Sequence, residues 1–331
     1  MKQYKVFGVP WHVAHQYELV KFPFIGQYDL LVNPYRNWGN SSRPMSEKFK
    51  WVTEFKKNYY DFAILHIDQQ SIYNPDAGDR IHKGRLFQEV RSIIGTDCPV
   101  IIINHMTPFH DKYDSAFVVE AIKGLVNDDF MIVNSNEAAK QWGWGQVVTH
   151  GLDVNEWWDL PKEPRAVTVL SQAGMEKAYR RIFLTTVKRI LSEMGVPFKW
   201  VGVDIKFNSF DEYRDYLGRS LVYFNPTWQS PRPRARTEAM LSGACIVTTP
   251  YQDADLFIKD GVNGFLTSQV KNKDPRIMDN PEYTANIIKW LVMEEPDKAI
   301  KIGQEGKKTA RKLFNSKSFE KQWLEVINQI L

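Results

Sequence analysis

The amino-acid sequence predicts an α/β protein with two doubly wound, Rossmann-like domains facing each other across a cleft. Three observations predict it. A chain of 331 residues is too long for one ordinary core, short apolar strand-like runs alternate with amphipathic helical runs, and this alternation restarts after a charged, proline-containing stretch. We therefore expect an N-terminal domain over 1–151, a linker over 152–165, a second domain over 166–313 and a C-terminal helix over 314–331.

In the first half, strand–turn–helix order at the very start is typical of a doubly wound sheet. A continuous apolar run around Phe62–Ile67 indicates a strand buried on both faces, as in parallel sheets. The expected strands are 5–9, 28–32, 59–70, 99–103, 130–135 and 146–149, and the expected helices are 14–22, 46–58, 85–94, 117–126 and 136–143.

The second half repeats the pattern. Apolar spacing near three and four residues predicts amphipathic helices toward the C-terminus. The expected strands are 166–171, 198–203, 220–227 and 244–249, and the expected helices are 182–195, 211–218, 237–243, 282–295, 297–314 and 318–331.

Composition is that of a globular protein, with 43% hydrophobic and 25% charged residues. The net charge of +4 permits an anionic ligand but is too small for a dedicated nucleic-acid binder. Cys98 and Cys245 lie in apolar, strand-like surroundings and are expected to be buried thiols, which suits a reducing compartment.

The first residues lack the long apolar core of a signal peptide, and no apolar run approaches the ~20 residues of a membrane span. We expect a cytoplasmic protein, with peripheral attachment to a membrane left open.

Candidate site residues of the first half follow strands, where doubly wound folds bind their ligands. His12 and His15 lie at the first strand–helix turn, where local capping or hydrogen bonding is the stronger expectation over catalysis. His66 and Asp68 at the end of a buried strand form a weaker candidate pair.

In the second half the candidate site is a Pro/Ser/Arg-rich loop followed by a short helix that begins near Thr237. A helix behind a polar loop offers unpaired backbone N–H groups and the positive end of its dipole, which favours phosphate. Arg232, Arg234 and Arg236 add positive charge there.

This stretch resembles the donor site of the retaining nucleotide-sugar glycosyltransferases with the GT-B fold. The resemblance rests on Glu238–Met240, Ser242–Ala244, Ile246–Thr248 and Gly261–Phe265. That family has two glutamates separated by seven residues, the first near the sugar and the second near the nucleotide ribose. Glu238 matches the second, whereas Ser230 replaces the first. The resemblance also implies a last helix that crosses back to the first domain.

Further roles are implied by the resemblance. His105, or second His110, matches a histidine close to the transferred sugar. Lys177, with Arg180 or Arg181, matches a basic pair that grips the donor diphosphate. The expected catalytic residues are thus His105, Lys177 and Arg180; the expected donor-binding residues are Lys177, Arg180, Arg181, Ser230, Arg232, Arg234, Arg236 and Glu238; and Trp11, His12 and His110 are expected on the acceptor or sugar side.

The expected function is transfer of a sugar from a nucleotide diphosphate sugar to an unidentified acceptor, with retention, without a metal and without a cofactor. The acceptor is left open between a glycan, a lipid carrier, a small molecule and modified nucleic acid. Asp253 and Asp255 imitate an acidic metal pair, but a metal role is not expected. Two alternatives remain: a glycosyltransferase that modifies DNA or another polyanion, and a non-catalytic nucleotide-sugar binding protein.

Overall fold

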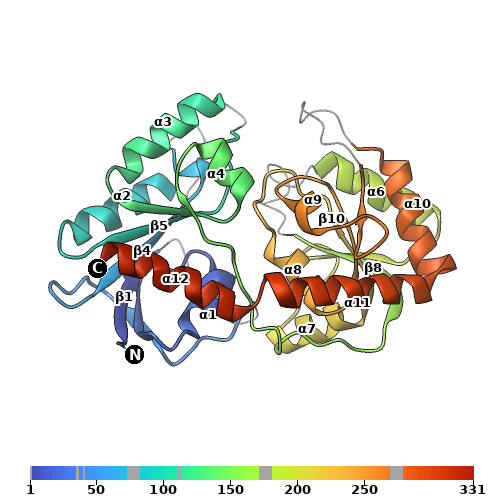
Figure 1. Cartoon of the computed structure of the whole chain (residues 1–331), viewed down its shortest axis with the longest axis horizontal. Coiled ribbons are helices and arrows are strands. Elements are labelled where there is room, and N and C mark those ends of the chain that lie inside the picture. Colours follow the sequence, from blue (N-terminus) through green and yellow to red (C-terminus); the bar gives the residue numbers. More distant parts are fainter. Residues whose placement is uncertain are drawn as a thin grey trace. The chain divides into compact units, whose positions relative to one another are not determined.

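The computed structural model describes residues 2–34, 37–39, 42–72, 83–110, 113–170, 181–268 and 279–331. They divide into two compact units, one comprising Met1–His150 and Lys317–Leu331 and the other Gly151–Ser316. Each unit contains one parallel β-sheet with helices on both faces (Figure 1), so the predicted α/β class with two Rossmann-like sheets is confirmed.

The sheet of the first unit has the strand order β3-β2-β1-β4-β5-β6-β7, and every neighbouring pair is parallel. The central strands are fully buried because helices cover both faces. The strands are β1 (Tyr4–Gly8), β2 (Ile25–Leu31), β3 (Phe49–Val52), β4 (Phe62–Ile67), β5 (Val100–Asn104), β6 (Phe130–Val133) and β7 (Gln146–Val147).

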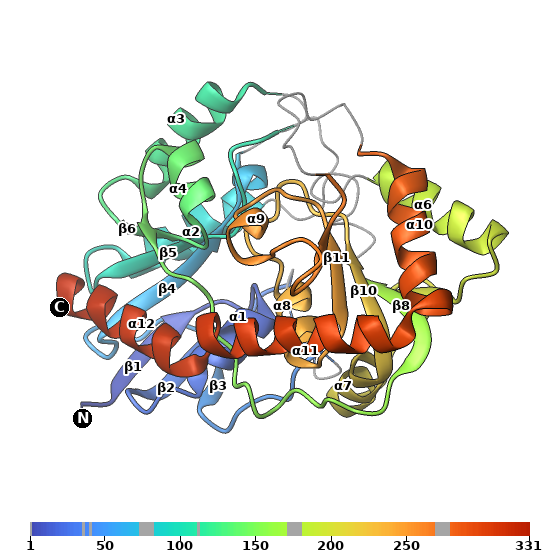
Figure 2. The same ribbon diagram turned by 45° about the vertical axis from the view of Figure 1, so that its right-hand side comes forward.

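Two cores lie on opposite faces of this sheet. One packs against α2, α3 and α4, and the other packs against α1 and α12 (Figure 2). Alternate residues of β4 point to the two cores, as a strand buried on both sides requires. The helices are α1 (Val13–Val20), the 3₁₀ turn η1 (Gln69–Ser71), α2 (Lys83–Ile94), α3 (Ser115–Val126), α4 (Asn136–Trp142) and α12 (Ser316–Ile330).

The helix expected over 46–58 is wrong. Phe49–Val52 instead forms β3, which pairs in parallel with β2 from Tyr28↔Phe49 to Leu31↔Val52. Aromatic and β-branched residues favour a strand, and Phe49 is buried whereas Lys50 and Trp51 are exposed, as an edge strand allows. Tertiary pairing therefore outweighs the helical spacing of the lysines around it.

The sheet of the second unit has the order β12-β11-β10-β8-β9, again with parallel neighbours. Its strands are β8 (Glu163–Val169), β9 (Phe198–Val201), β10 (Ser220–Asn225), β11 (Cys245–Thr248) and β12 (Phe265–Leu266). β8 begins inside the stretch 152–165 that the sequence suggested as a linker.

The helices around this sheet are α6 (Arg181–Glu193), α7 (Phe210–Arg219), α8 (Arg234–Leu241), α9 (Ala254–Phe257), α10 (Pro281–Lys289) with a following π-turn η3 (Trp290–Glu294), and α11 (Pro296–Leu313). α11 approaches the turn before β11 closely: a Cβ on Gly303 would lie 2.3 Å from the carbonyl oxygen of Gly243. Only glycine fits at this helix position.

Both cysteines are buried free thiols, as expected. Burial raises the pKa of the Cys98 thiol to about 11 and also raises that of Cys245, so both remain protonated at neutral pH. Within the described ranges, no helix has the length and apolarity needed to cross a bilayer.

Candidate functional site

Each sheet reverses its strand order at one point, and doubly wound folds bind ligands beyond the carboxyl ends of the strands at such a point. In the first unit the reversal lies between β1 and β4, and in the second it lies between β8 and β10. The residues that follow these strands are therefore the first places to look for a site in each unit.

In the first unit, four histidines gather at the carboxyl ends of β1, β4 and β5. His66 Nδ1 lies 2.7 Å from His105 Nε2. The ring of His12 stacks on that of His105 with ring centres 4.7 Å apart, and the ring of His15 packs edge-to-face against it with ring centres 5.7 Å apart. They come from three segments that are far apart in the sequence, and the parallel sheet brings these segments together.

His12 also has the local role expected for it. Its Nδ1 accepts a hydrogen bond from the backbone N–H of His15 at 3.2 Å and so caps α1. The capping expectation is confirmed, and the same ring packs on His105. A capping histidine must keep Nδ1 unprotonated, which places the proton of a neutral His12 on Nε2.

The His66 side chain is buried, at 1% exposure. Burial, with a smaller contribution from the charge of His12, lowers the pKa of His66 to about 3. His66 is therefore a neutral imidazole at physiological pH. A neutral ring can exchange hydrogen bonds with a sugar hydroxyl without adding charge.

Asp68, at the end of β4, lies beside this cluster in sequence but has its own partners. Its carboxylate caps η1 through the backbone N–H of Gln70 and pairs with Lys83 at the start of α2. The Lys83 ammonium in turn lies 5.7 Å from the ring centre of Trp11. Trp11 thus lies in the same strand-end region as His12, and its role on an acceptor or sugar side stays a prediction.

His110 lies on the segment between β5 and α3 and packs on Tyr113. Its ring lies 4.9 Å from that of Tyr113, on the segment that leads into α3. Of the two histidines proposed after β5, His105 is the one at the strand end.

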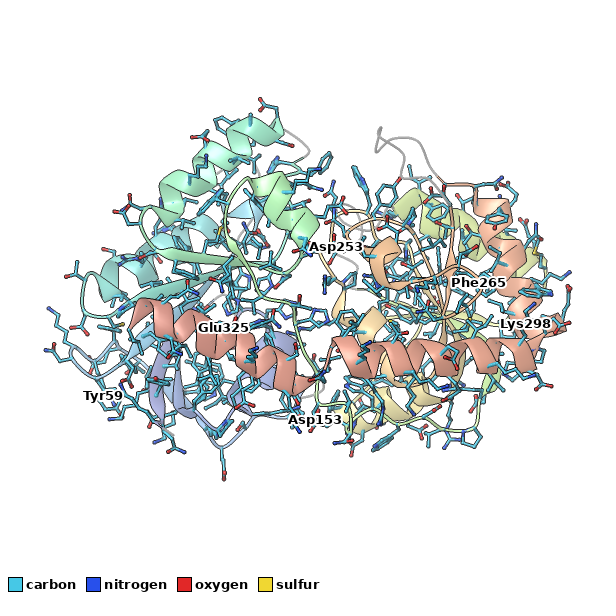
Figure 3. The ribbon with its side chains drawn as sticks, viewed as in Figure 1. Tyr59, Asp153, Asp253, Phe265, Lys298 and Glu325 are labelled. Carbon is cyan, nitrogen blue, oxygen red and sulfur yellow. The ribbon has the colours of Figure 1, made fainter. Side chains whose placement is uncertain are left out.

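In the second unit, the loops after β10 and β11 are tied to each other by side-chain contacts. Thr249 Oγ1 donates to the carbonyl of Thr227, Gln252 Nε2 donates to the carbonyl of Trp228 at 3.1 Å, and Arg232 pairs with Asp253 at 3.4 Å. Figure 3 labels Asp253 on the loop just before α9. These ties hold two loops together at the carboxyl edge of the sheet.

The backbone of these loops is strained. Five described non-glycine residues have positive φ, and three of them, Arg232, Gln252 and Asp253, lie here, at +48°, +56° and +62°. Such conformations each cost on the order of 1–3 kcal/mol and gather at ligand sites. The strained residues are the same ones whose side chains join the loops.

Two buried amides add to the polar character of this site. Asn225, the last residue of β10, is fully buried, and Gln229 is 2% exposed. Within the described residues neither end of either amide has a hydrogen-bond partner. An unsatisfied buried polar group costs about 1–3 kcal/mol, so these amides are suited to a polar ligand or water.

The three arginines take different places. Arg234 begins α8 and is half-buried, which places the helix one turn earlier than the expected start near Thr237. Arg232 and Arg236 lie over the rings of Phe314 and Phe257, at 5.7 Å and 5.0 Å respectively. Those two rings contact each other edge-to-face at 5.2 Å.

Arg236 is 1% exposed and donates to Thr248 Oγ1 at 3.3 Å. Burial lowers the pKa of the Arg232 guanidinium, although Asp253 acts in the opposite direction. The arginines therefore face the interior of the two loops and α8, and do not form an exposed basic stripe.

Glu238 is buried in α8, and its Oε2 accepts a hydrogen bond from the Tyr213 hydroxyl at 2.6 Å. Ser230 is half-buried, and its carbonyl accepts from Thr227 Oγ1 at 3.3 Å. Lys177 and Arg180 lie outside the described residues, and Arg181 begins α6 with an exposed side chain.

Across the described ranges, no three His, Cys, Asp or Glu side chains are grouped so that they could hold a metal ion. Asp253, one of the two aspartates that imitate a metal pair, is engaged by Arg232.

Several residues of these sites escaped the sequence reasoning. Asn225, Gln229 and Gln252 have no motif, and Tyr213 lies on a different helix from its partner Glu238. The pairing of His66 with His105 had one available signal: both follow the buried apolar runs of neighbouring parallel strands.

No family model matches the sequence, and no curated protein sequence matches it. Solved structures do match. HepE from Anabaena, in complex with UDP and glucose, aligns with a TM-score of 0.69 at 13% identity over 99% of this chain and 100% of that one. A sucrose-phosphate synthase from Thermosynechococcus elongatus gives 0.67 at 11% identity over 99% of each chain.

TarM gives a TM-score of 0.58 at 14% identity over 80% of this chain and 55% of its own. At such identities the likeness concerns the fold alone. The two parallel sheets with their helices match those of GT-B glycosyltransferases, and this chain therefore has the GT-B fold.

Proposed function

We propose that the protein is a glycosyltransferase that moves a sugar from a nucleotide diphosphate sugar to an acceptor, with retention and without a metal. The observation that carries the proposal is the pair of tied loops after β10 and β11. They combine buried guanidinium groups, strained backbone and buried amides without a described partner, and the loop after β10 lies next to the strand-order reversal between β8 and β10. Anabaena HepE, with the same fold, binds UDP and UDP-glucose.

Each part of the donor suits a different part of this site. Guanidinium groups bind phosphate through charge-assisted hydrogen bonds. Arg232 on the loop and Arg234 in the first turn of α8 are the guanidinium groups that we assign to the phosphates. Asn225 and Gln229 offer amide donors and acceptors that suit sugar hydroxyl groups. Glu238, held by Tyr213, is assigned to the ribose hydroxyl groups, and Lys177 with Arg180 to the diphosphate.

The polyanion-modifying alternative finds less support. Long-range capture of a polyanion needs an exposed basic surface, whereas Arg232 and Arg236 are turned inward and Arg234 is half-buried. A non-catalytic binder would have the same loops, and turnover is what separates it from an enzyme.

A panel of nucleoside diphosphates and nucleotide sugars tests binding through the thermal unfolding temperature, because a ligand at 100 times its Kd stabilises the folded state by about 2.7 kcal/mol. We expect one base to be selected. Glu238→Gln should lower the affinity for that nucleotide about tenfold or more, because it removes the carboxylate. Glu282 is an exposed glutamate of α10, and Glu282→Gln serves as the matched control.

Turnover is then measured as release of the nucleoside diphosphate, with NMR detection of the anomer formed. Retention predicts that the product keeps the donor's anomeric configuration. Equal nucleotide affinity in Glu238→Gln and wild type would refute the ribose assignment, and tight binding without release in the presence of varied acceptors would favour the non-catalytic binder.

A further inference from the structure

The backbone pairing of β4 and β5 places His105 next to His66. β4 and β5 are parallel neighbours, with His66 opposite Ile103 and Ile67 opposite Asn104. The pairing continues one residue further, since the N–H of His105 donates to the carbonyl of Ile67 at 3.1 Å. The position of the two Cα atoms is thus set by the sheet.

The two rings meet edge to edge. Their planes differ by only 7° with ring centres 5.0 Å apart, while His66 Nδ1 and His105 Nε2 are 2.7 Å apart. The distance between the ring centres exceeds the distance between the two nitrogens by about two ring radii. The two nitrogens therefore lie on the line between the centres, and the two rings lie almost in one plane. This is the geometry of an N–H···N hydrogen bond, in which one ring must donate and the other accept.

The remaining ring nitrogens decide which ring donates. His66 Nε2 is buried without a hydrogen-bond partner among the described residues. An orphaned buried N–H is rarer than an orphaned acceptor, so the His66 proton belongs on Nδ1, where it has a partner. His66 Nδ1–H then donates to His105 Nε2, and a neutral His105 must carry its own proton on Nδ1.

The surroundings of His105 are compatible with that tautomer. The amide of Asn134 lies 3.5 Å from His105 Nδ1, and a half-turn of the amide presents its oxygen to an N–H there. The contact at Nδ1 is longer than the one at Nε2. Nδ1–H is therefore the group that can be handed over to a ligand oxygen, while Nε2 stays with His66.

We infer that His66 is a positioning residue that fixes the tautomer and ring plane of His105, so that His105 presents an Nδ1–H donor to a hydroxyl oxygen of a sugar bound at this edge of the first sheet. The part concerning the sugar rests on the proposed function; the tautomer does not. Burial lowers the pKa of His66, so His66 itself adds no positive charge to this pair of rings at physiological pH.

The tautomers are measured by long-range ¹H–¹⁵N correlation spectra of the ¹⁵N-histidine-labelled protein at pH 7, without ligand. The signals are assigned with single variants His66→Gln, His105→Gln and His12→Gln. We expect protonated Nδ1 in His66 and His105, and protonated Nε2 in the helix-capping His12, which serves as an internal contrast. A wild-type His105 protonated on Nε2 would overturn the inference.

Variants test the cause. In His66→Leu, which can neither donate nor accept, we expect His105 to shift toward the Nε2–H tautomer that free histidine prefers. In His66→Gln, whose amide can donate to Nε2, we expect the Nδ1–H tautomer to be retained. Ile64→Val, on the same strand and facing the same core, controls for a general disturbance of β4. An unchanged His105 spectrum in His66→Leu would contradict the positioning role.

If the protein transfers sugar, His66→Leu should also lower kcat on the order of tenfold to a hundredfold with KM for the nucleotide sugar nearly unchanged, and His66→Gln should recover part of the loss. A protein that never turns over, yet shows the predicted tautomers, would refute the proposed function and leave the positioning of His105 standing. Full kcat in His66→Leu, together with a shifted His105 tautomer, would refute the link between them.

Discussion

At the carboxyl edge of the first sheet four histidine rings cluster beside the Asp68–Lys83 ion pair, and His66 among them is a buried neutral ring. At the carboxyl edge of the second sheet a buried ion pair joins two loops. His66 and His105 share one hydrogen bond, and Arg232 and Asp253 share an ion pair. The two edges have the same strand–helix architecture, so the difference lies in the side chains. The first edge suits an uncharged group or a developing positive charge, and the second suits an anion.

The largest expected effect comes from breaking the ion pair in the second unit. Arg232→Ala removes the guanidinium that pairs with the Asp253 carboxylate, which is 5% exposed. We expect a loss of about 3 kcal/mol, typical of a broken buried pair. The readout is the oxidation of buried Met240 against urea concentration, which reports unfolding of α8.

Arg189→Ala is the matched control, because Arg189 and Glu193 form an exposed pair on α6 whose loss should cost less than 1 kcal/mol. If both variants lose the same stability, the second edge does not depend on its buried charges and the contrast between the edges fails.

The stabilities of the two units should respond differently to acidification. Unfolded His66 takes up a proton as the pH falls below about 6.5, whereas folded His66 does so only near its pKa of about 3. Its contribution to stability is complete above pH ~6.5 and declines as the pH falls. Between pH 7 and pH 5 we expect the first unit to lose about 2 kcal/mol, measured by the oxidation of buried Met131 in urea.

The second unit should respond only at lower pH. Burial acts to raise the pKa of Asp159, but hydrogen bonds from Lys307 and Gln304 and the charge of Lys162 outweigh it and lower that pKa. Stability from this carboxylate is present above the ordinary aspartate pKa of about 4 and is lost as the pH falls through the folded pKa. Parallel losses at Met131 and Met240 from pH 7 to 5, or a loss at Met131 that persists in His66→Leu, would contradict this account.

The smallest effect is expected from Tyr213→Phe, which removes the hydroxyl that donates to Glu238 at 2.6 Å. Loss of one hydrogen bond to a charged acceptor should cost about 2 kcal/mol or less in stability and weaken the selected nucleotide several-fold. Tyr216→Phe, on the same helix, is the control. Equal nucleotide affinity in the two variants would mean that Tyr213 does not hold Glu238 for binding.

The tetrapeptide Phe-Lys-Trp-Val occurs twice and shows what the sequence could and could not predict. At 198–201 it follows a helix and a turn, and it was expected to be a strand, as β9 confirms. At 49–52, among lysines with helical spacing, it was expected to be a helix but is the edge strand β3. Both copies lie at a sheet edge, a long-range property that local pattern does not carry.

The same limit applies to the sites. Strand ends were predictable from apolar runs, and this placed His12, His66 and His105 at one edge. The tie between Arg232 and Asp253 was not predictable, because it depends on the folded path of two loops and on positive φ angles at residues other than glycine. The inward turn of Arg236 was missed because alternation in sequence gives no common face on a helix.

The most direct test of the central claim is a comparison of Met240 and Met131 oxidation in urea with and without saturating nucleoside diphosphate. If the donor binds at the carboxyl edge of the second sheet, the Met240 transition should move to higher urea, by a shift worth about 2.7 kcal/mol at 100 times Kd, and should move more than that of Met131. A shift confined to Met131, or none at Met240 with any nucleotide, would contradict the assignment of the second unit as the donor-binding unit.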